Sequence, residues 1–223
     1  HAPEFTLMEV YCAGSAYKEM CGLLQEILKA GISVIYPDMI VPAGTSNCEI
    51  NFNNNFCYLS FSDACRNYLG IEKDKCNLPY LAETFPLLFA ECMGASTWIS
   101  KLVNKLLSSH LTQPTFITEI PSNCSPFVRV NSSDPLLSER AWFFVGGYDV
   151  ADIYTDENDP AVVEGALKKQ SQIMGSAINR SFIELLKFGL MQTAGIGMSL
   201  NRFFMVFLGK LPVDIKETIL YPL

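Results

Sequence analysis

Histidine and charged side chains are scarce in this sequence. Its 223 residues include only two histidines, His1 and His110, and charged residues make up 17%, below the roughly 25% of an average soluble domain. A low charge leaves polar or apolar surface that is suited to contacts with other molecules. The scarcity of histidine restricts histidine-based catalysis and metal ligation to two positions.

Concentrated positive charge is also missing. Lys+Arg total 16 against Asp+Glu 23, which gives a net charge of -7, and the longest basic run is the pair Lys168 and Lys169. Nucleic acids and anionic lipids attract proteins mainly through clustered positive charge. The sequence therefore predicts no nucleic-acid partner.

No stretch is long and apolar enough to cross a bilayer. The longest uncharged run, 188–201, holds three glycines and falls short of the roughly 20 apolar residues that a spanning helix needs. The first residues, HAPEFT, lack the basic region and apolar run of a signal peptide. We therefore expect no transmembrane segment, and either a mature secreted protein or an excised ectodomain.

Cysteine, by contrast, is plentiful in the first 124 residues. The closest pair, Cys57 and Cys65, is separated by seven residues and no CxxC occurs, so zinc, iron–sulfur and dithiol redox sites do not fit. An even number at wide spacing favours disulfides in an oxidising compartment. The predicted disulfide cysteines are Cys12, Cys21, Cys48, Cys57, Cys65, Cys76, Cys92 and Cys124.

Some pairings are favoured by local geometry, although eight cysteines leave the connectivity open. Cys48 and Cys57 flank the turn-forming FNNN of a predicted hairpin, 48–61, and would then lie opposite each other. Cys65 and Cys76 flank the end of a short helix predicted to run from about Ser62 to Gly70. Cys12 and Cys21 can pair only if the first helix begins after Cys12.

Glycosylation sequons agree with a secreted protein. Asn131 and Asn179 each begin an Asn-x-Ser pattern, and Asn123 does so with the weakening Pro126 after it. Chance matches to so short a motif are common. Together with the cysteines, the sequons predict a glycoprotein.

Hydrophobic periodicity predicts helices and strands without a regular βαβ alternation. Helices are expected at 15–31 and at 81–92 followed by 95–110, where Pro86 kinks or divides the region. Another is expected from Pro160, where Asp159 caps a helix that either runs for about 30 residues or breaks near Gly175. Strands are expected at 32–36, 115–120, 126–130 and 141–150. This mixture predicts an α+β fold with helices packed on a small, mostly antiparallel sheet and a disulfide-stapled amino-terminal half.

Few residues offer catalytic or metal-binding chemistry. His110 is the one interior histidine on which a hydrolase could be built, and His1 with His110 could supply nitrogen ligands to copper. The acidic residues of 149–159 could bind calcium, but their order does not match an EF-hand, and their position before a helix favours a helix-dipole role. The glycine-rich 194–199 lacks the spacing of phosphate-binding loops, so a turn or close packing is expected there.

These inferences predict a single disulfide-rich extracellular domain over residues 1–223, with a subdivision near residue 124 as the alternative. The predicted function is non-catalytic binding of an extracellular protein, glycan or lipid, without a cofactor or metal, in a protein that is secreted or displayed on the outer face of a membrane. The alternative is a secreted hydrolase that uses His110.

Overall fold

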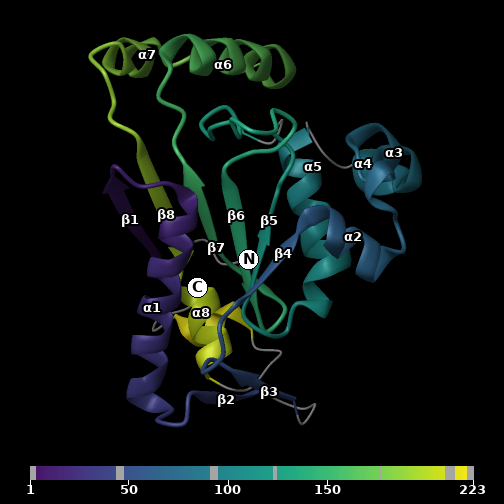
Figure 1. Cartoon of the computed structure of the whole chain (residues 1–223), viewed down its shortest axis with the longest axis vertical. Coiled ribbons are helices and arrows are strands. Elements are labelled where there is room, and N and C mark those ends of the chain that lie inside the picture. Colours follow the sequence, from purple (N-terminus) through teal and green to yellow (C-terminus); the bar gives the residue numbers. More distant parts are fainter. Residues whose placement is uncertain are drawn as a thin grey trace.

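A six-stranded sheet forms the centre of the protein in the computed structural model, which describes residues 4–43, 48–90, 95–122, 125–175, 177–208 and 214–219. The strand order is β1-β8-β7-β6-β5-β4 (Figure 1). Neighbouring strands are antiparallel except β4 and β5, which are parallel. The strands are β1 (Leu7–Ala13), β4 (Cys57–Ser60), β5 (Thr115–Thr118), β6 (Arg140–Val145), β7 (Tyr148–Thr155) and β8 (Thr193–Ser199).

Helices cover both faces of this sheet. Helix α1 (Tyr17–Ile35) lies against β6, β7 and β8 on one face. On the other face, α2 (Phe61–Leu69), α5 (Ala95–Leu102) and the π-helical η3 (Val103–Leu107) pack on β5 and β6. The remaining elements are β2 (Ile40–Ala43), β3 (Cys48–Asn51), η2 (Lys73–Lys75), α3 (Leu78–Thr84), α4 (Pro86–Ala90), η4 (Ser108–His110), α6 (Pro160–Met174), α7 (Arg180–Leu186), α8 (Leu200–Phe207) and η6 (Ile215–Thr218).

Two apolar clusters hold the helices to the sheet. Phe143 packs toward α1 with Leu24 and Leu28, whereas its neighbour Phe144 packs with Trp98 under α5. Successive side chains of a strand point to opposite faces, so one apolar strand supplies both clusters. Helices α6 and α7 carry a small cluster of their own and lie beyond the ends of β7 and β8 (Figure 1).

Several helix ends agree with local sequence signals. Ser60 caps α2 by accepting a hydrogen bond from the backbone N–H of Asp63, and Gly70 ends the helix in the left-handed conformation. Asp159 caps α6 by accepting from the backbone N–H groups of Ala161 and Val162. Of the two predicted outcomes for this helix, the break at Gly175 is the one observed, since α6 ends there.

Four predicted elements are wrong. The expected strand 126–130 forms only isolated bridges, at Val128 and Val130, and the expected strand 141–150 is two strands, β6 and β7, joined by a turn at 146–147. The expected strand 32–36 largely belongs to α1, which continues to Ile35, because the fully buried Ile32 extends the apolar stripe of that helix. The expected hairpin 48–61 is divided between two sheets: β3 pairs with β2, and β4 pairs with β5. A local bridge between Cys48 and Cys57 therefore has no hairpin to support it.

The predicted disulfides are not found among the described residues. Cys12, Cys21, Cys57, Cys65 and Cys76 carry free thiols, while the side chains of Cys48, Cys92 and Cys124 lie outside the described residues. The thiols of Cys65 and Cys76 share a hydrogen bond, which together with burial raises the pKa of Cys65. An apolar cluster holds this half of the chain together, and no disulfide joins its described cysteines.

The predicted fold class is consequently wrong. The sheet is mixed and six-stranded, and no disulfide staples the described part of the amino-terminal half. That residues 1–223 form a single domain stays a prediction. Within the described residues, no helix combines the length and apolar character needed to span a membrane.

The sequon asparagines take part in local backbone structure. The side-chain oxygen of Asn131 accepts from the backbone N–H of Ser133 at 2.8 Å, and that of Asn179 caps α7 by accepting from Phe182 at 3.2 Å. Asn123 lies outside the described residues. Turn and cap formation therefore accounts for asparagine at the two described positions.

Candidate active site on the open half of the sheet

The face of the sheet opposite α1 is covered over only part of its width. Over β5 and β6, Ile117 and Phe144 are fully buried beneath α2, α5 and η3. Over β7, β8 and β1, the same face carries Gly197, carboxylates and tyrosines that are partly or fully exposed, together with the buried Gly195. We call this second region the open half: Glu9, Tyr11, Asp152, Tyr154, Gly195 and Gly197.

The strand register arranges the open half in two rows. Gly195 pairs with Tyr11 on β1 and with Tyr154 on β7, and Tyr154 in turn pairs with Arg140 on β6. Gly197 pairs with Glu9 on one side and Asp152 on the other. Paired residues place their side chains on the same face of a sheet. Each glycine, which has no side chain, therefore lies between two residues with large polar side chains on the same face.

The two glycines differ in what lies above them. A Cβ atom at Gly195 would meet Cε1 of Tyr11 at 2.7 Å, so the tyrosine ring rests directly on this glycine. A Cβ atom at Gly197 would meet no heavy atom within 4 Å. Gly195 is needed for packing, whereas Gly197 leaves bare backbone open to a ligand between Glu9 and Asp152.

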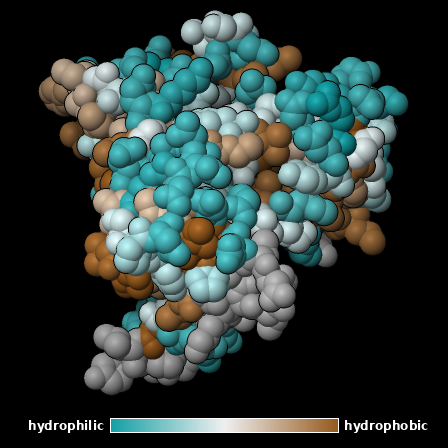
Figure 2. Space-filling model, turned by 60° about the horizontal axis from the view of Figure 1, so that its bottom comes forward, coloured by the Kyte–Doolittle hydropathy of each residue, from teal (hydrophilic) through white to brown (hydrophobic). Residues whose placement is uncertain are grey.

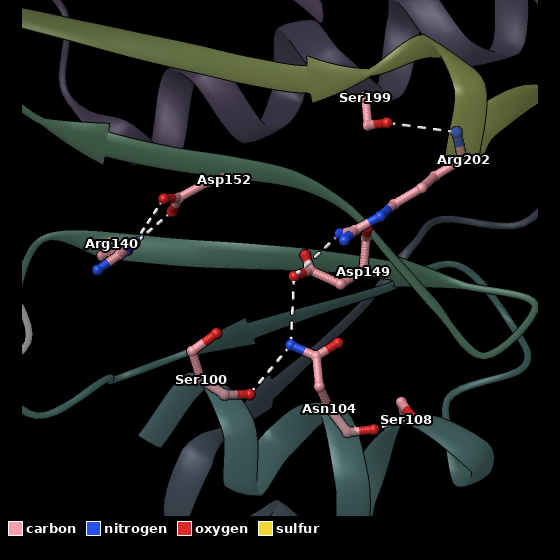
Figure 3. Close-up of polar contacts among 8 residues, drawn as sticks. All are labelled: Ser100, Asn104, Ser108, Arg140, Asp149, Asp152, Ser199 and Arg202. Atoms are coloured by element: carbon pink, nitrogen blue, oxygen red, sulfur yellow. Dashed lines mark hydrogen bonds and ion pairs between the residues drawn. The ribbon is translucent and has the colours of Figure 1, made fainter. Parts of the chain in front are cut away.

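A tightly held ion pair forms one wall of the open half. The guanidinium of Arg140 donates from Nε to Oδ1 of Asp152 at 2.7 Å and from Nη2 to the other carboxylate oxygen (Figure 3). The Arg140 guanidinium also lies 5.0 Å from the ring centroid of Trp142 and 5.9 Å from that of Tyr154. Bidentate pairing and ring contacts of this kind hold a carboxylate in a fixed orientation.

Negative charge surrounds the tyrosines. Burial, with Tyr11 and the carboxylates of Asp152 and Asp156 adding to it, raises the pKa of Tyr154 to about 12, although Arg140 opposes the rise. Burial and the charges of Glu9 and Asp156 likewise raise the pKa of Tyr11. Burial raises the pKa of Asp156, and Arg129 opposes it. Both phenols thus stay neutral near pH 7 and line a negatively charged surface.

A second ion pair lies farther along β7. Arg202, in the first turn of α8, donates from Nη1 to the backbone oxygen of Asp149 at 2.6 Å, and the same nitrogen lies 3.4 Å from its Oδ2 (Figure 3). Burial raises the pKa of Asp149, while Arg202 and a hydrogen bond from Asn104 lower it. The Arg202 side chain is 41% exposed, so it offers a cation at the edge of the open half.

The structure separates the residues to which the sequence pointed. His110 stacks on Tyr68 at a centroid distance of 4.7 Å, at the end of η4, and His1 lies outside the described residues. The acidic run is distributed among an ion pair with Arg202, an ion pair with Arg140 and the cap of α6. No group of three potential metal ligands occurs in the described part of the chain.

Residues of the open half escaped the sequence-based reasoning. The glycines of 194–199 were expected in a turn or in close packing; they lie inside β8, where Gly195 packs closely under Tyr11 and Gly197 stays open. The usable signal was the alternation of Asp152, Tyr154 and Asp156 along one strand, together with glycine at every second position of the next. Only the register shows that these residues face one another.

The surface gives little support to a broad apolar contact area. On the face shown in Figure 2, apolar residues form separate patches among hydrophilic ones. Single exposed apolar side chains are normal on protein surfaces. The open half is therefore a better candidate site than any apolar patch visible in that view.

Comparison with known proteins gives a family for this fold and site. The family model described as tRNA synthetases class II (D, K and N) matches residues 1–223. Lysine–tRNA ligase of Saccharolobus solfataricus is 28% identical over 233 residues, which cover 100% of this chain and 46% of that protein. Lysine–tRNA ligases of Enterobacter sp. strain 638 and Dehalococcoides mccartyi strain CBDB1 are 28% and 29% identical, over 45% and 46% of their lengths. The chain thus spans less than half the length of these relatives.

These matches correct the predicted function. The expectations of a secreted binding module and of a secreted hydrolase using His110 are both wrong, because the family is one of tRNA synthetases and its named members are ligases. "More likely not an enzyme" is wrong for the same reason.

The predicted partners and location are overturned as well. The expectation of no nucleic-acid partner conflicts with a family whose members are named for tRNA. The expectation of a secreted glycoprotein with extracellular protein, glycan or lipid ligands is wrong as well, because the chain matches tRNA synthetases along its whole length. A net negative charge does not exclude a nucleic-acid partner, since net charge says little about a ligand held at one site. The chain belongs to the class II tRNA synthetases of the D, K and N group.

Proposed function

We propose that this chain is the part of a lysine–tRNA ligase that binds lysine and presents its carboxylate for activation, and that the open half is the lysine site. The relatives that match along the whole chain are named as ligases of lysine and tRNA. The observation that carries the proposal is the pair of glycines in β8, flanked by carboxylates and tyrosines.

The charge of the open half suits a cationic amino acid. Glu9 and Asp152 of the open half and Asp156, which directly follows β7, contribute three carboxylates, and Arg140 neutralises Asp152. The excess of negative charge is thus left with Glu9 and Asp156. A lysine ammonium is attracted to such a surface and can donate three hydrogen bonds to it.

The shape of the open half suits the aliphatic part of lysine. Bare backbone at Gly197 lets a methylene chain lie against the sheet, and the rings of Tyr11 and Tyr154 stand over the neighbouring row. Lysine side chains commonly bury their stem and keep the ammonium in a polar setting. Tyrosine rings attract cations as well.

Arg202 supplies the opposite charge. Joining an amino acid to tRNA requires an activated carboxyl group, for which ATP is the co-substrate of this proposal. The exposed part of the Arg202 guanidinium can meet an anionic phosphate or carboxylate at the edge of the open half. We thus place the lysine ammonium near Glu9 and Asp156, and the lysine carboxylate and the ATP phosphates toward Arg202.

Calorimetric titration of the chain with lysine and with norleucine tests the proposal. Norleucine keeps the carbon chain and the amino-acid head of lysine but lacks the terminal ammonium. We expect lysine to bind at least about tenfold more tightly, because norleucine has no ammonium to pair with the carboxylates of Glu9 and Asp156. Equal affinities, or binding of neither, would count against a lysine site here.

A further inference from the structure

We propose that Asn104 is a positioning residue: it holds the carboxylate of Asp149, and through it the guanidinium of Arg202, at the edge of the open half. The inference rests on the proposed function, because Arg202 matters there as the cation for an anionic co-substrate. Asn104 lies in η3, 45 residues before Asp149, on an element that otherwise serves the covered side of the sheet.

The local structure of η3 turns Asn104 toward β7. Val103 and Leu107 of this π-helical turn are fully buried, and Ser108 Oγ donates to the backbone oxygen of Asn104 at 2.6 Å. Asn104 Nδ2 donates to the backbone oxygen of Ser100 at 3.0 Å and to Asp149 Oδ2 at 3.4 Å (Figure 3). A π-turn inside a helix is rare and is frequently found at functional sites.

Asp149 connects Asn104 with Arg202. Its Oδ2 accepts from Asn104 and also pairs with Nη1 of Arg202, and its backbone oxygen accepts from the same nitrogen. Asp149 also precedes a stretch of β7 whose register shifts against β6 between Phe143 and Phe144. This irregularity places a carboxylate on the same face as the covered Phe144, directly beside η3.

Charges on three sides decide whether Asp149 stays ionised. Burial is the largest influence and raises the pKa of Asp149; Arg202 of α8 and the hydrogen bond from Asn104 of η3 lower it. Asp152 of β7 raises this pKa and Arg140 of β6 lowers it by smaller amounts. Because the Asn104 amide donates to the charged carboxylate, loss of that amide favours protonation and weakens the grip on Arg202.

Arg202 is held from both of its ends. Its backbone N–H donates to Ser199 Oγ at 3.3 Å, which caps α8, and its guanidinium is held by Asp149. The backbone contact fixes where the side chain begins, and Asp149 fixes where it points. Asn104 thus affects the direction of the Arg202 side chain through Asp149, without contacting the anionic co-substrate itself.

An NMR pH titration of the Asp149 carboxyl carbon tests the positioning role independently of activity. Replacing the donor amide should raise the pKa of Asp149 in Asn104→Ala and raise it further in Asn104→Asp, where a second carboxylate faces the first. Asn104→Gln should restore part of the wild-type value. Ser108→Ala is the matched control, because it removes the neighbouring hydrogen bond to the Asn104 backbone and leaves the amide in place. A pKa of Asp149 that is the same in all five proteins would overturn the inference.

Binding measurements connect this result with the ligand. In the chain with Asn104→Ala, we expect the affinity for ATP to fall about fivefold, as for loss of one ordinary hydrogen bond, and the affinity for lysine to stay unchanged. An equal loss for both ligands would point to general disturbance and contradict the inference. If wild-type protein binds neither ligand while the Asp149 pKa shifts as expected, the proposed function fails and the positioning of Arg202 stands.

Discussion

The covered and open halves of one sheet face use the same backbone geometry for opposite purposes. In the covered half, Ile117 and Phe144 are fully buried under three helical elements. In the open half, the corresponding positions on β8 and β7 are Gly195, Gly197, Asp152 and Tyr154. The covered half stabilises the fold by apolar burial, and the open half keeps backbone and charge accessible.

The covered half should therefore determine the stability of the fold, and the open half should determine ligand binding. Removal of apolar surface from water stabilises a protein in proportion to the area buried. Glycine and half-exposed carboxylates contribute little of this kind, so their presence on a central strand weakens the sheet. We therefore expect substitutions in the two halves to act on different measurements.

The largest expected effect is on the stability of the covered half. Phe144→Ala should lower the free energy of unfolding by about 3–5 kcal/mol, because a fully buried ring is replaced by a cavity. Denaturant unfolding followed by circular dichroism measures this change. Tyr11→Ala in the open half, where the side chain is 57% exposed, is the matched comparison and should cost far less. Similar losses for the two variants would break the distinction between the halves.

The boundary between the halves should show an intermediate loss. In Asp152→Ala, the guanidinium of Arg140, whose side chain is only 13% exposed, loses its bidentate partner. We expect about 2 kcal/mol of destabilisation, less than for a fully buried pair because Asp152 is itself partly exposed. Asp152→Asn keeps one acceptor oxygen and should lose less. Equal stability of all three proteins in thermal unfolding would show that the ion pair adds nothing to the fold.

The two glycines should separate packing from binding. Gly197→Ala adds a methyl group where no atom lies within 4 Å, so the free energy of unfolding should change by less than about 0.5 kcal/mol. Lysine affinity should nevertheless fall about tenfold, because the added group occupies the ligand's place on the strand. Gly195→Ala forces the Tyr11 ring to move and should also lower stability. Unchanged lysine affinity in Gly197→Ala would remove Gly197 from the site.

The smallest expected effect is on the pH dependence of lysine binding. Burial raises the pKa of Asp156, so its carboxyl takes up a proton at a higher pH than an ordinary aspartate and loses its attraction for ammonium. Lysine affinity should fall about threefold as the pH is lowered through this raised pKa. Asp156→Asn should bind more weakly near neutral pH and lack this step. If the same fall in lysine affinity with pH is still seen in Asp156→Asn, another group causes it and the prediction is wrong.

The same shift has a defined sign for stability. Because the pKa of Asp156 is raised on folding, the native state binds its proton more readily than the unfolded state does. Stability from this group is fully present below the unfolded pKa and is lost as the pH rises through the folded pKa. As the pH rises through the folded pKa of Asp156, the free energy of unfolding should fall more in the wild type than in Asp156→Asn.

Local signals predicted local structure well. The end of α2 at Gly70 was predicted, and its start, predicted near Ser62, lies at Phe61 after the cap Ser60, because caps depend on residues within one helical turn. The end of α6 at Gly175 was one of the two predicted outcomes. The hairpin predicted for 48–61 failed because the partner of β4 is β5, more than 50 residues away. Hydrophobic pattern alone does not select a distant partner.

The candidate site depended on the same distant pairings. Asp152 faces Gly197 and Tyr154 faces Gly195 only through the β7–β8 register. Wide cysteine spacing is equally compatible with free thiols, and Cys21 shows why: it lies fully buried in α1, where burial raises its pKa to about 12 and keeps it an unreactive apolar side chain. Reasoning from composition therefore chose the wrong compartment.

The most direct test of the account is an NMR map of the chain's backbone amides during titration with lysine. We predict that the largest chemical-shift changes fall on Glu9, Tyr11, Asp152, Tyr154 and Gly197 of the open half. Amides of the covered half, such as those of Ile117 and Phe144, should change little. The largest changes in the covered half, or no saturable change anywhere, would contradict a lysine site on the open half of the sheet.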